Sequence, residues 1–542
     1  MVSRKQLFNL TLAGMLSIGI LSACGSNGNS GNGAPGGTPA DGAAATAAAD
    51  TPATDGTDSA KTVDLNVWWV NSGFKGIDKD SPLYKDYAER LGVGVISPYV
   101  EWNGGTEYLN QLNLKIAAGE IPNLFQPWNG IENDLAKNGA IADLTELLPE
   151  YAPNMWKLVP EDVWNVIKAN DPTGQGHIYW IPSVNAYEKT TGLIRKDWLD
   201  NLGLQMPTTQ EEYVKVLKAF RDQDPNGNGK ADEVPTGGRE NARWMDHLFN
   251  EYGVAIVEGY PDWDVYDGEL TYAAVTQNMK DALAFIHTLY QDKLLDQETF
   301  LNDKSAWDGK IYSGVVGNYY HWGEGVYGFL ASIEQATGAK ADYSVLPVLE
   351  APGYEGKGFI STKRTGSPAW VVSAQQDEEH LIASLKLLDE LADQSKWSDL
   401  RWGLEGMHYK VENGKKIMLP EDRSVQQNRL NPFNQFADLE FAQKLILENG
   451  SDNDMWQYEQ AARNMEESQQ YVKVIGGDGL PSSVYDNYPD IKNNTLWYEY
   501  ATKIVIGTYP IEKFDEFVDK WYKSGGTEVT EKAREWYARV HQ

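Results

Sequence analysis

The stretch Val63-Asp-Leu-Asn-Val-Trp-Trp69 decides the fold class of this chain. Its residues Val63, Leu65, Val67 and Trp69 occupy every second position, which is the pattern of a half-buried β-strand. Successive side chains of a strand point to opposite faces, so we expect Trp68 and Trp69 to face in opposite directions.

The segments after this strand alternate between helical and strand patterns. Residues 81–91 have a helical pattern, residues 93–100 form an apolar run, and Thr106 opens a helix that Gly119 closes. A short strand follows at residues 124–125, and the alternation predicts βαβ units around a parallel sheet. The same patterns predict strands at 192–195 and 369–373, helices at 209–221 and 278–290, and a mostly helical chain from about residue 376.

Length and charge restrict the class of protein. The chain has 542 residues, more than one compact domain holds, and 41% of them are hydrophobic. It carries 47 Lys and Arg against 78 Asp and Glu, a formal net charge of −31. Because nucleic-acid binding needs clustered cations, this acid excess excludes nucleic acid as the partner. The 19 Trp and 29 Tyr residues suit a wet, sugar-like ligand.

The first residues indicate the cellular compartment. Arg4 and Lys5 precede a mostly apolar stretch, residues 7–21, that is short for a membrane-spanning helix. It runs into Leu21-Ser-Ala-Cys24, which resembles the lipobox of bacterial lipoproteins. That resemblance implies cleavage before Cys24, the single cysteine of the chain, and attachment of lipid to its thiol. The alternative is an ordinary signal peptide with a chance cysteine.

Residues 25–60 are almost all Gly, Ala, Ser, Thr, Asn, Asp and Pro. A segment without aromatic or aliphatic anchors cannot offset the entropy of ordering, so we expect a flexible tether. A lipid anchor and a tether together predict a protein that works just outside a membrane without spanning it.

Residues 222–233 carry the most specific chemical pattern. The sequence Asp222-Gln-Asp-Pro-Asn-Gly-Asn-Gly-Lys-Ala-Asp-Glu233 alternates oxygen-bearing side chains around glycine, as in a calcium loop of EF-hand type. Two registers fit, with either Asp222 or Asp224 at the first position. The alternative is a solvated Asn/Gly turn without metal. Pro235 and the glycines after it disfavour an exiting helix, so calcium here is expected to be structural.

The chain around this loop resembles the extracellular solute-binding proteins of family 1, the lipoprotein components of oligosaccharide ABC importers. The resemblance rests on Arg195-Lys-Asp-Trp-Leu-Asp-Asn-Leu-Gly-Leu204, on Pro207-Thr-Thr209 and on residues 224–233. Further matching pieces are Leu114-Lys-Ile-Ala-Ala-Gly-Glu-Ile-Pro-Asn123, Ile178-Tyr-Trp-Ile-Pro182 and Gly403-Leu-Glu-Gly-Met-His-Tyr409. With the opening strand, they extend from about residue 63 to residue 410.

The resemblance implies an α/β, two-lobed periplasmic-binding-protein-like fold with a hinge and an interlobe ligand cleft. It implies a monomer that delivers an oligosaccharide to the permease subunits of an ABC transporter. It also implies the second calcium register, with the ligands Asp224, Asn226, Asn228, Lys230 (carbonyl), Asp232 and Glu233. The implied parts are a signal peptide at 1–23, a lipidated tether at 24–60, a first lobe from 61–182 and 359–415, and a second lobe from 183–358 and 416–542.

Ligands of doubly wound sheets bind beyond the carboxyl ends of the strands. Aromatic rings placed there can stack on sugars, and polar side chains can bind the hydroxyls. The candidate ligand-binding residues are therefore Trp69, Asn71, Trp128, Tyr187, Tyr320, His321, Trp322, Arg364, Trp402 and Glu405. Residues 319–322 are expected in a polar aromatic loop after the apolar run 311–316. A core position is the alternative for each ring, and Trp198, Trp370 and Trp497 are expected in the core.

Enzyme motifs are absent from the segments expected to be ordered. These segments hold no nucleophile elbow, zinc-protease helix or phosphate-binding loop, and the seven histidines show no metal spacing. A glycosidase needs only two carboxylates in a cleft, so a surface-anchored glycoside hydrolase with Glu405 as general acid is one alternative. A carbohydrate-sensing lectin without transport is the other.

Overall fold

The structure is a computed structural model that describes residues 62–69, 76–100, 106–128, 130–397, 402–412, 414–419, 438–448, 450 and 453–541. Buried hydrophobic residues of this part form three clusters, which we call the first, second and third cores. The first core belongs to one β-sheet, and the other two belong to another.

The first core surrounds a five-stranded sheet with the order β2-β1-β3-β13-β4. β1 (Val63–Trp68) is parallel to β2 (Val93–Ile96) and β3 (Leu124–Phe125). β13 (Thr365–Val372) is antiparallel to both β3 and β4 (Ile181–Val184). The prediction of parallel βαβ units is therefore confirmed for the first three strands. β4 leads out of this sheet and β13 leads back into it, which is why these two run in opposite directions.

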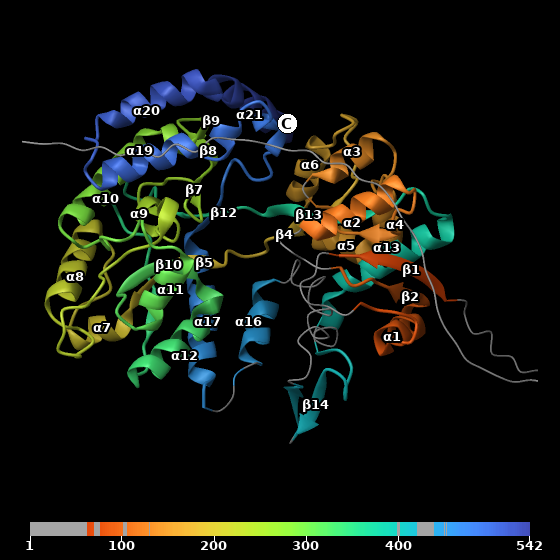
Figure 1. Cartoon of the computed structure of the whole chain (residues 1–542), viewed down its shortest axis with the longest axis horizontal. Coiled ribbons are helices and arrows are strands. Elements are labelled where there is room, and N and C mark those ends of the chain that lie inside the picture. Colours follow the sequence, from red (N-terminus) through yellow and green to blue (C-terminus); the bar gives the residue numbers. More distant parts are fainter. Residues whose placement is uncertain are drawn as a thin grey trace, which may run out of the picture. The chain divides into compact units, whose positions relative to one another are not determined.

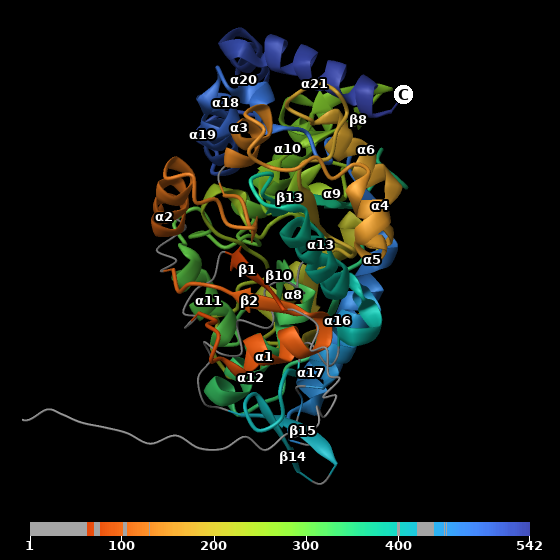
Figure 2. The ribbon, with the colours of Figure 1, turned by 90° about the vertical axis from the view of Figure 1, so that its right-hand side faces the viewer.

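Helices cover this sheet, as Figures 1 and 2 show. α1 (Pro82–Leu91) begins after Ser81, whose Oγ accepts a hydrogen bond from the amide of Leu83, and it ends at Gly92 with a left-handed φ of 67°. α13 (Glu378–Ala392) packs on β1 and on α5. The other helices of this part are α2 (Thr106–Ala117), α3 (Ile131–Lys137), α4 (Leu147–Tyr151), α5 (Pro153–Leu158) and α6 (Glu161–Ala169).

The second and third cores lie on the two faces of a three-stranded sheet with the order β10-β5-β11. Leu193 of β5 (Thr190–Arg195) belongs to the third core, and its neighbour Ile194 belongs to the second. β10 (Asn318–Trp322) and β11 (Tyr343–Val345) are both antiparallel to β5. This sheet therefore departs from the parallel pattern that the sequence predicts.

The prediction of a loop at residues 319–322 is wrong, because these residues belong to β10. The apolar run 311–316 spans the end of α11 (Lys304–Tyr312) and a turn at Gly314, where φ is 77°. Tyr320 is consequently a buried strand residue, and its hydroxyl lies 2.9 Å from the hydroxyl of Thr190.

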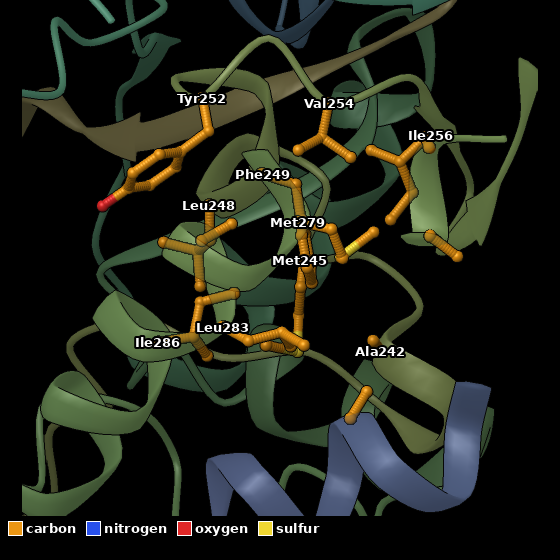
Figure 3. Packing of buried hydrophobic residues seen from close by; sticks show 14 of the residues in the cluster. Ala242, Met245, Leu248, Phe249, Tyr252, Val254, Ile256, Met279, Leu283 and Ile286 are labelled. Atoms are coloured by element: carbon orange, nitrogen blue, oxygen red, sulfur yellow. The ribbon is translucent and has the colours of Figure 1, made fainter. Parts of the chain in front are cut away.

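Two helices of the second core, α8 and α10, lie where the sequence predicts helices. α8 (Gln210–Asp222) begins with a capping box, in which Thr209 Oγ1 accepts from the amide of Glu212 (3.3 Å) and the Glu212 carboxylate accepts from the amide of Thr209 (3.3 Å). Side chains of α9 (His247–Asn250) and α10 (Gln277–Gln291) pack with Met245 and Val254 in Figure 3. Trp198, Trp370 and Trp497 are buried, which confirms their predicted core positions.

The remaining elements complete these cores. The other helices are α7 (Lys196–Asn201), α12 (Val326–Thr337), α16 (Leu439–Leu447), α17 (Met455–Ser468), α18 (Pro489–Lys492), α19 (Thr495–Val505), α20 (Lys513–Trp521) and α21 (Thr527–Val540). Two-stranded pairs are β6 (Ile256–Val257) with β7 (Tyr260–Pro261), β8 (Trp263–Tyr266) with β9 (Glu269–Tyr272), β12 (Ile360–Thr362) with β16 (Val472–Val474), and β14 (Tyr409–Glu412) with β15 (Lys415–Met418). Among the described helices, none has the length and apolar character needed to cross a membrane.

Two chain segments connect the sheets. Residues 185–189 lead from β4 to β5, and residues 363–364 lead from β12 to β13. Asn185 bonds the two segments together, because its amide donates to the carbonyl of Arg364 (3.0 Å) and its Nδ2 donates to the carbonyl of Lys363 (2.8 Å). Gln469 ties a third part of the chain to them, because its Nε2 donates to the carbonyl of Glu188 at 2.9 Å.

Candidate functional site

A cavity of about 970 Å³ opens at these connecting segments. Its volume is at the upper end of the range for small-molecule sites. The lining combines side chains from the first sheet's part of the fold, from the connecting segments, from the second sheet's part and from the C-terminal helices; representative residues are Glu132, Trp180, Asn185, Tyr187, Glu188, Lys189, Glu258, Trp322, Lys363, Asp486 and Arg539.

Trp322 forms an aromatic platform in this cavity. It lies at the end of β10 and is 44% exposed, although most indoles of the described chain are buried. Tyr187 also lines the cavity, and its hydroxyl donates to Glu324 Oε2 at 2.8 Å. Burial, and next the charge of Glu324, raise the pKa of Tyr187 well above its usual value, so the phenol stays neutral. A half-exposed indole with a neutral phenol on the same wall can stack on an apolar ring face.

Trp244 supports Trp322 from behind. The two rings are nearly perpendicular (82°) with centroids 6.2 Å apart, and Trp244 is buried. Its backbone is left-handed (φ 61°), which is rare for a bulky residue. A Cβ at Gly259 would lie 2.8 Å from the Cα of Arg243, so the turn between β6 and β7 packs directly against the residue before Trp244. Strained backbone of this kind persists where the surrounding structure enforces it, often at functional sites.

Glutamates form the acidic part of the wall. Burial raises the pKa of Glu132, to which Asn133 Nδ2 donates at 3.2 Å. Burial also raises the pKa of Glu188, whose Oε1 accepts from the amide (2.8 Å) and the hydroxyl (2.6 Å) of Thr190. Glu258 forms an ion pair with Arg243 at 3.1 Å. The wall therefore presents strong hydrogen-bond acceptors.

Asp246 lies behind this wall and is completely buried. Burial is the main cause that raises its pKa to about 8, and the negative charges of Glu258 and Glu188 add to it. A buried carboxyl close to other carboxylates is held in its neutral form at neutral pH.

Two of the four cations that line the cavity are paired. Lys363 Nζ lies 2.7 Å from Asp262 Oδ2, and Lys189 Nζ lies 4.0 Å from Glu324 Oε1. Lys137 and Arg539 are exposed at the cavity and have no ion-pair partner within the described residues.

Of the ten ligand-binding residues predicted from the sequence, Tyr187 and Trp322 line the cavity. Within the described chain, the other predicted residues do not line the cavity. Trp69 packs edge-on against Trp370 (6.4 Å), whereas Trp68 contacts Tyr108. Trp128 is half-buried on the first core, and Tyr320 and His321 are buried in β10. Asn71 lies outside the described residues, as does Cys24.

Three further predicted residues have protein partners or face solvent. Arg364 forms an ion pair with Asp162 at 3.0 Å. Trp402 is buried, and its Nε1 donates to Glu448 Oε2 at 3.0 Å. Glu405 is exposed beside the β14–β15 pair. A general-acid role for Glu405 in a cleft has no support in this position.

Sequence reasoning missed several lining residues, among them Glu188, Asn185 and Lys363. The signal for the first two was present, because they flank Tyr187 in the segment after the expected strand at 178–182. Lys363 carried no signal of its own, since its place depends on the return of the chain from β12 to β13.

The loop at residues 222–233 has the turn geometry of an oxygen-rich site. Gly227 and Gly229 are left-handed (φ 67° and 74°), and the Asp224 carboxylate accepts from the amides of Asn228 (3.0 Å) and Gly229 (2.9 Å). Asp222 instead binds the guanidinium of Arg221 with both oxygens, at 2.7 and 2.8 Å. The side chain of Asp222 is therefore committed elsewhere, which favours the register that begins at Asp224.

Glu233 has one carboxylate oxygen without a partner. Its Oε1 is buried without a hydrogen bond, and burial, followed by the charges of Asp232 and Asp224, raises its pKa. Within the described residues, however, no group of three or more His, Cys, Asp or Glu side chains lies close enough together to hold a metal ion. Hard oxygen donors and one orphaned carboxylate oxygen fit Ca²⁺ in kind.

Comparison with known proteins gives the chain a family. The family model described as bacterial extracellular solute-binding protein matches residues 92–392, more than half of the chain. The fructooligosaccharide ABC transporter substrate-binding protein FusA of Streptococcus pneumoniae is 31% identical over 277 residues, which cover 47% of this chain and about half (48%) of that relative. The lipoprotein LipO of Bacillus subtilis is 25% identical over 79% of this chain and 84% of its own length.

A solved structure confirms the fold. An extracellular solute-binding protein from Bifidobacterium longum subsp. infantis superposes with a TM-score of 0.66 and 20% identity, over 91% of this chain and 100% of that chain. The predicted fold, α/β with two lobes as in solute-binding proteins, is therefore confirmed.

Proposed function

The chain belongs to the bacterial extracellular solute-binding protein family, and we propose that it captures an oligosaccharide in the 970 Å³ cavity and delivers it to the permease of an ABC importer. The observation that carries the proposal is the cavity itself, with the exposed Trp322 at the segments that connect the two sheets. The relative from S. pneumoniae, named as a fructooligosaccharide transporter component, supports a sugar as the solute.

The chemistry of the wall suits a sugar. An indole face can cover the apolar face of a sugar ring, and the carboxylates of Glu132 and Glu188 can accept bonds from hydroxyls. A preformed cavity lowers the ordering cost of binding, so such contacts convert into affinity. The wall contains more acceptors than a hydrophobic ligand would use.

Closure would occur at the connecting segments. Both segments line the cavity through Asn185 and Lys363, so a change in their backbone angles changes the cavity directly. Hinge closure around a ligand is the usual motion of proteins with this architecture. The permease would then recognise the closed form.

Two further features complete the proposal. Cys24 is lipidated and anchors the protein at the outer face of the membrane, and the name of the B. subtilis relative, a lipoprotein, supports this anchor. Asp224, Asn226, Asn228, Lys230, Asp232 and Glu233 hold a structural Ca²⁺, supported by the left-handed glycines and the orphaned Glu233 oxygen. Ca²⁺ would draw the carboxylates of the loop together.

Titration calorimetry against a panel of oligosaccharides tests the proposal, with a reducing-sugar assay on the same mixtures. We expect at least one sugar to bind with micromolar or tighter affinity and to remain intact. Release of shorter sugars would support the glycoside hydrolase instead, and absence of binding across the panel would refute the proposal. Reconstitution with the cognate permease separates transport from sensing, because a sensor would bind sugar without supporting uptake.

A further inference from the structure

The charges of the cavity indicate which class of oligosaccharide it takes. This inference rests on the proposed function and adds to it the charge of the solute. The cavity has acidic and basic lining residues in similar numbers, but the two signs differ in their surroundings. The cations are paired with carboxylates or exposed to solvent, whereas Glu132 and Glu188 have no cation beside them.

Lys363 is the most enclosed cation of the wall. Its ammonium contacts Asp262 at 2.7 Å, and the negative charge of Asp478 also acts on it. Asp478 is held in place because it accepts from the amide (2.9 Å) and the hydroxyl (3.1 Å) of Thr365. One ammonium between two carboxylates leaves no positive charge for a ligand.

The other cations are weak anchors for an anion. Lys189 lies 4.0 Å from Glu324, which also accepts from Tyr187. Lys137 and Arg539 are unpaired within the described residues, but they are exposed, so water and salt screen their charges. An anion at these positions would therefore gain little binding energy.

Glu132 and Glu188 are two acids of the wall without a cation. Asn133 donates to Glu132, Thr190 and Thr362 donate to Glu188, and within the described chain no Lys or Arg contacts either carboxylate. Asp171 also lines the cavity without an ion pair in the described residues, but backbone amides and the hydroxyl of Thr173 donate to its oxygens. Asp246 is buried close enough to Glu188 and Glu258 for their charges to raise its pKa, so it adds no positive charge there. Each of these two glutamates can accept from a ligand hydroxyl, and each repels a ligand carboxylate.

We infer that the cavity selects neutral oligosaccharides and rejects those that carry uronate carboxylates. A uronate carboxylate would lose its hydration and be placed beside carboxylates that have no counter-ion. The paired lysines could bind it only by breaking their own ion pairs. A neutral sugar meets no such barrier, because its hydroxyls donate to the same oxygens.

Titration calorimetry with matched sugars tests this inference. The probes are pairs that differ only in oxidation of the hydroxymethyl group to a carboxylate, such as galactose and galacturonate trimers of equal linkage, within a wider panel of neutral sugars and uronates. We expect neutral sugars to bind at least about 100-fold more tightly than any uronate, with affinities that change less than about twofold between 50 and 500 mM salt.

Variants locate the cause. Glu132→Gln and Glu188→Gln keep the size of each side chain and remove its charge. We therefore expect each to lower the ratio of neutral-sugar affinity to uronate affinity about tenfold. Glu531→Gln removes an exposed carboxylate of α21 and is expected to leave the ratio unchanged. Circular dichroism checks that the variants are folded.

The possible failures are distinguishable. A uronate that binds as tightly as its neutral partner, with strong salt dependence, would refute the inference and leave the proposed function intact. A panel in which no sugar binds would refute both. Unchanged discrimination in both glutamate variants would also overturn the inference, because the acids would then not cause it.

Discussion

Two acidic regions of the molecule, the loop at residues 222–233 and the wall of the cavity, use carboxylates in opposite ways. In the loop, Asp224 is partly exposed and accepts from backbone amides, so it is fixed in place at little desolvation cost. Glu132 in the wall and Asp246 behind it are buried, and burial raises the pKa of both. Exposed, oriented carboxylates suit a hard cation, whereas buried ones suit hydroxyl donors.

The difference teaches that the count of acidic residues says little about what binds. Surroundings decide whether a carboxylate attracts a cation, accepts from a hydroxyl or holds a proton. It also predicts that the two regions act independently. Substitutions in the loop should alter stability and leave sugar affinity unchanged. Substitutions in the wall should alter sugar affinity, and substitutions of the buried acids should alter the dependence of stability on pH.

The largest effect is expected on the pH dependence of stability, and it comes from Asp246 and Glu251, the acids on either side of α9. Burial raises the pKa of Asp246 and of Glu251 to about 8 each, from ordinary values near 4. These two carboxyls thus bind more protons in the folded state than in the unfolded state between about pH 4 and pH 8, so their contribution to stability falls as the pH rises through this window. Burial lowers the pKa of His247 and of His321 to about 3, which has the opposite effect below about pH 6.5, so the net fall in stability is expected between about pH 7 and pH 8. For each group, a pKa that is higher by one in the folded state corresponds to about 1.4 kcal/mol of free energy.

Melting curves between pH 4.5 and 9 measure this slope. The double variant Asp246→Asn, Glu251→Gln should flatten it and raise Tm most at the alkaline end. Glu531→Gln, at an exposed position of α21, is the matched control and should leave the slope unchanged. A wild-type Tm that does not fall between pH 7 and pH 8 would contradict the raised pKa of the two buried carboxyls.

The second effect concerns the aromatic platform. Trp322→Ala should weaken binding of the best sugar about 30-fold, equivalent to about 2 kcal/mol, because buried Trp contacts dominate binding energies. Trp322→Phe should restore most of the affinity. Tm of the unliganded protein should change little, since the indole is 44% exposed. Equal affinity in the alanine variant would exclude Trp322 from the sugar site.

The third effect tests the loop. Chelation should lower Tm by about 2–4 °C, because a ligand at 100 times its Kd stabilises by about 2.7 kcal/mol. Glu233→Gln should remove this response. Sugar affinity should be the same with Ca²⁺ and with chelator. If chelation weakened sugar binding, the loop and the wall would be coupled and the comparison would fail.

The smallest effect lies at the start of α8. Thr209→Ala removes one half of the capping box and should cost about 1 kcal/mol, or roughly 1 °C in Tm. Thr209→Ser is the control that keeps the hydroxyl. The response to chelation should persist in the alanine variant, since the cap and the loop lie at opposite ends of the helix.

The sequence predicts much of the first sheet and less of the second. Alternation in residues 63–69 and the helical pattern of residues 81–91 are local signals, and both β1 and α1 follow them. The prediction for β10 fails because both faces of this strand are covered. Tyr319 packs on Phe329, and Tyr320 stacks on His247. A strand buried on both faces has no polar alternation to identify it.

The site shows the same limit. The connecting segment at residues 185–189 could be located from the strand before it, so Tyr187 could be predicted. The rings of Trp69 and Trp402 also follow strands or turns, but tertiary partners bury them, Trp370 for the first and Glu448 for the second. Burial depends on distant segments, and no local spacing encodes it.

The two hydrogen bonds of Asn185 have a consequence for the distribution of cavity widths. Its backbone amide donates to Arg364 and its side chain donates to Lys363 on the neighbouring connection, so a twist of one connection pulls on the other. We therefore expect distances measured between paired spin labels on the two sides of the cavity to fall into two sharp populations. Asn185→Ala removes the bond to Lys363 and should broaden each population toward intermediate widths.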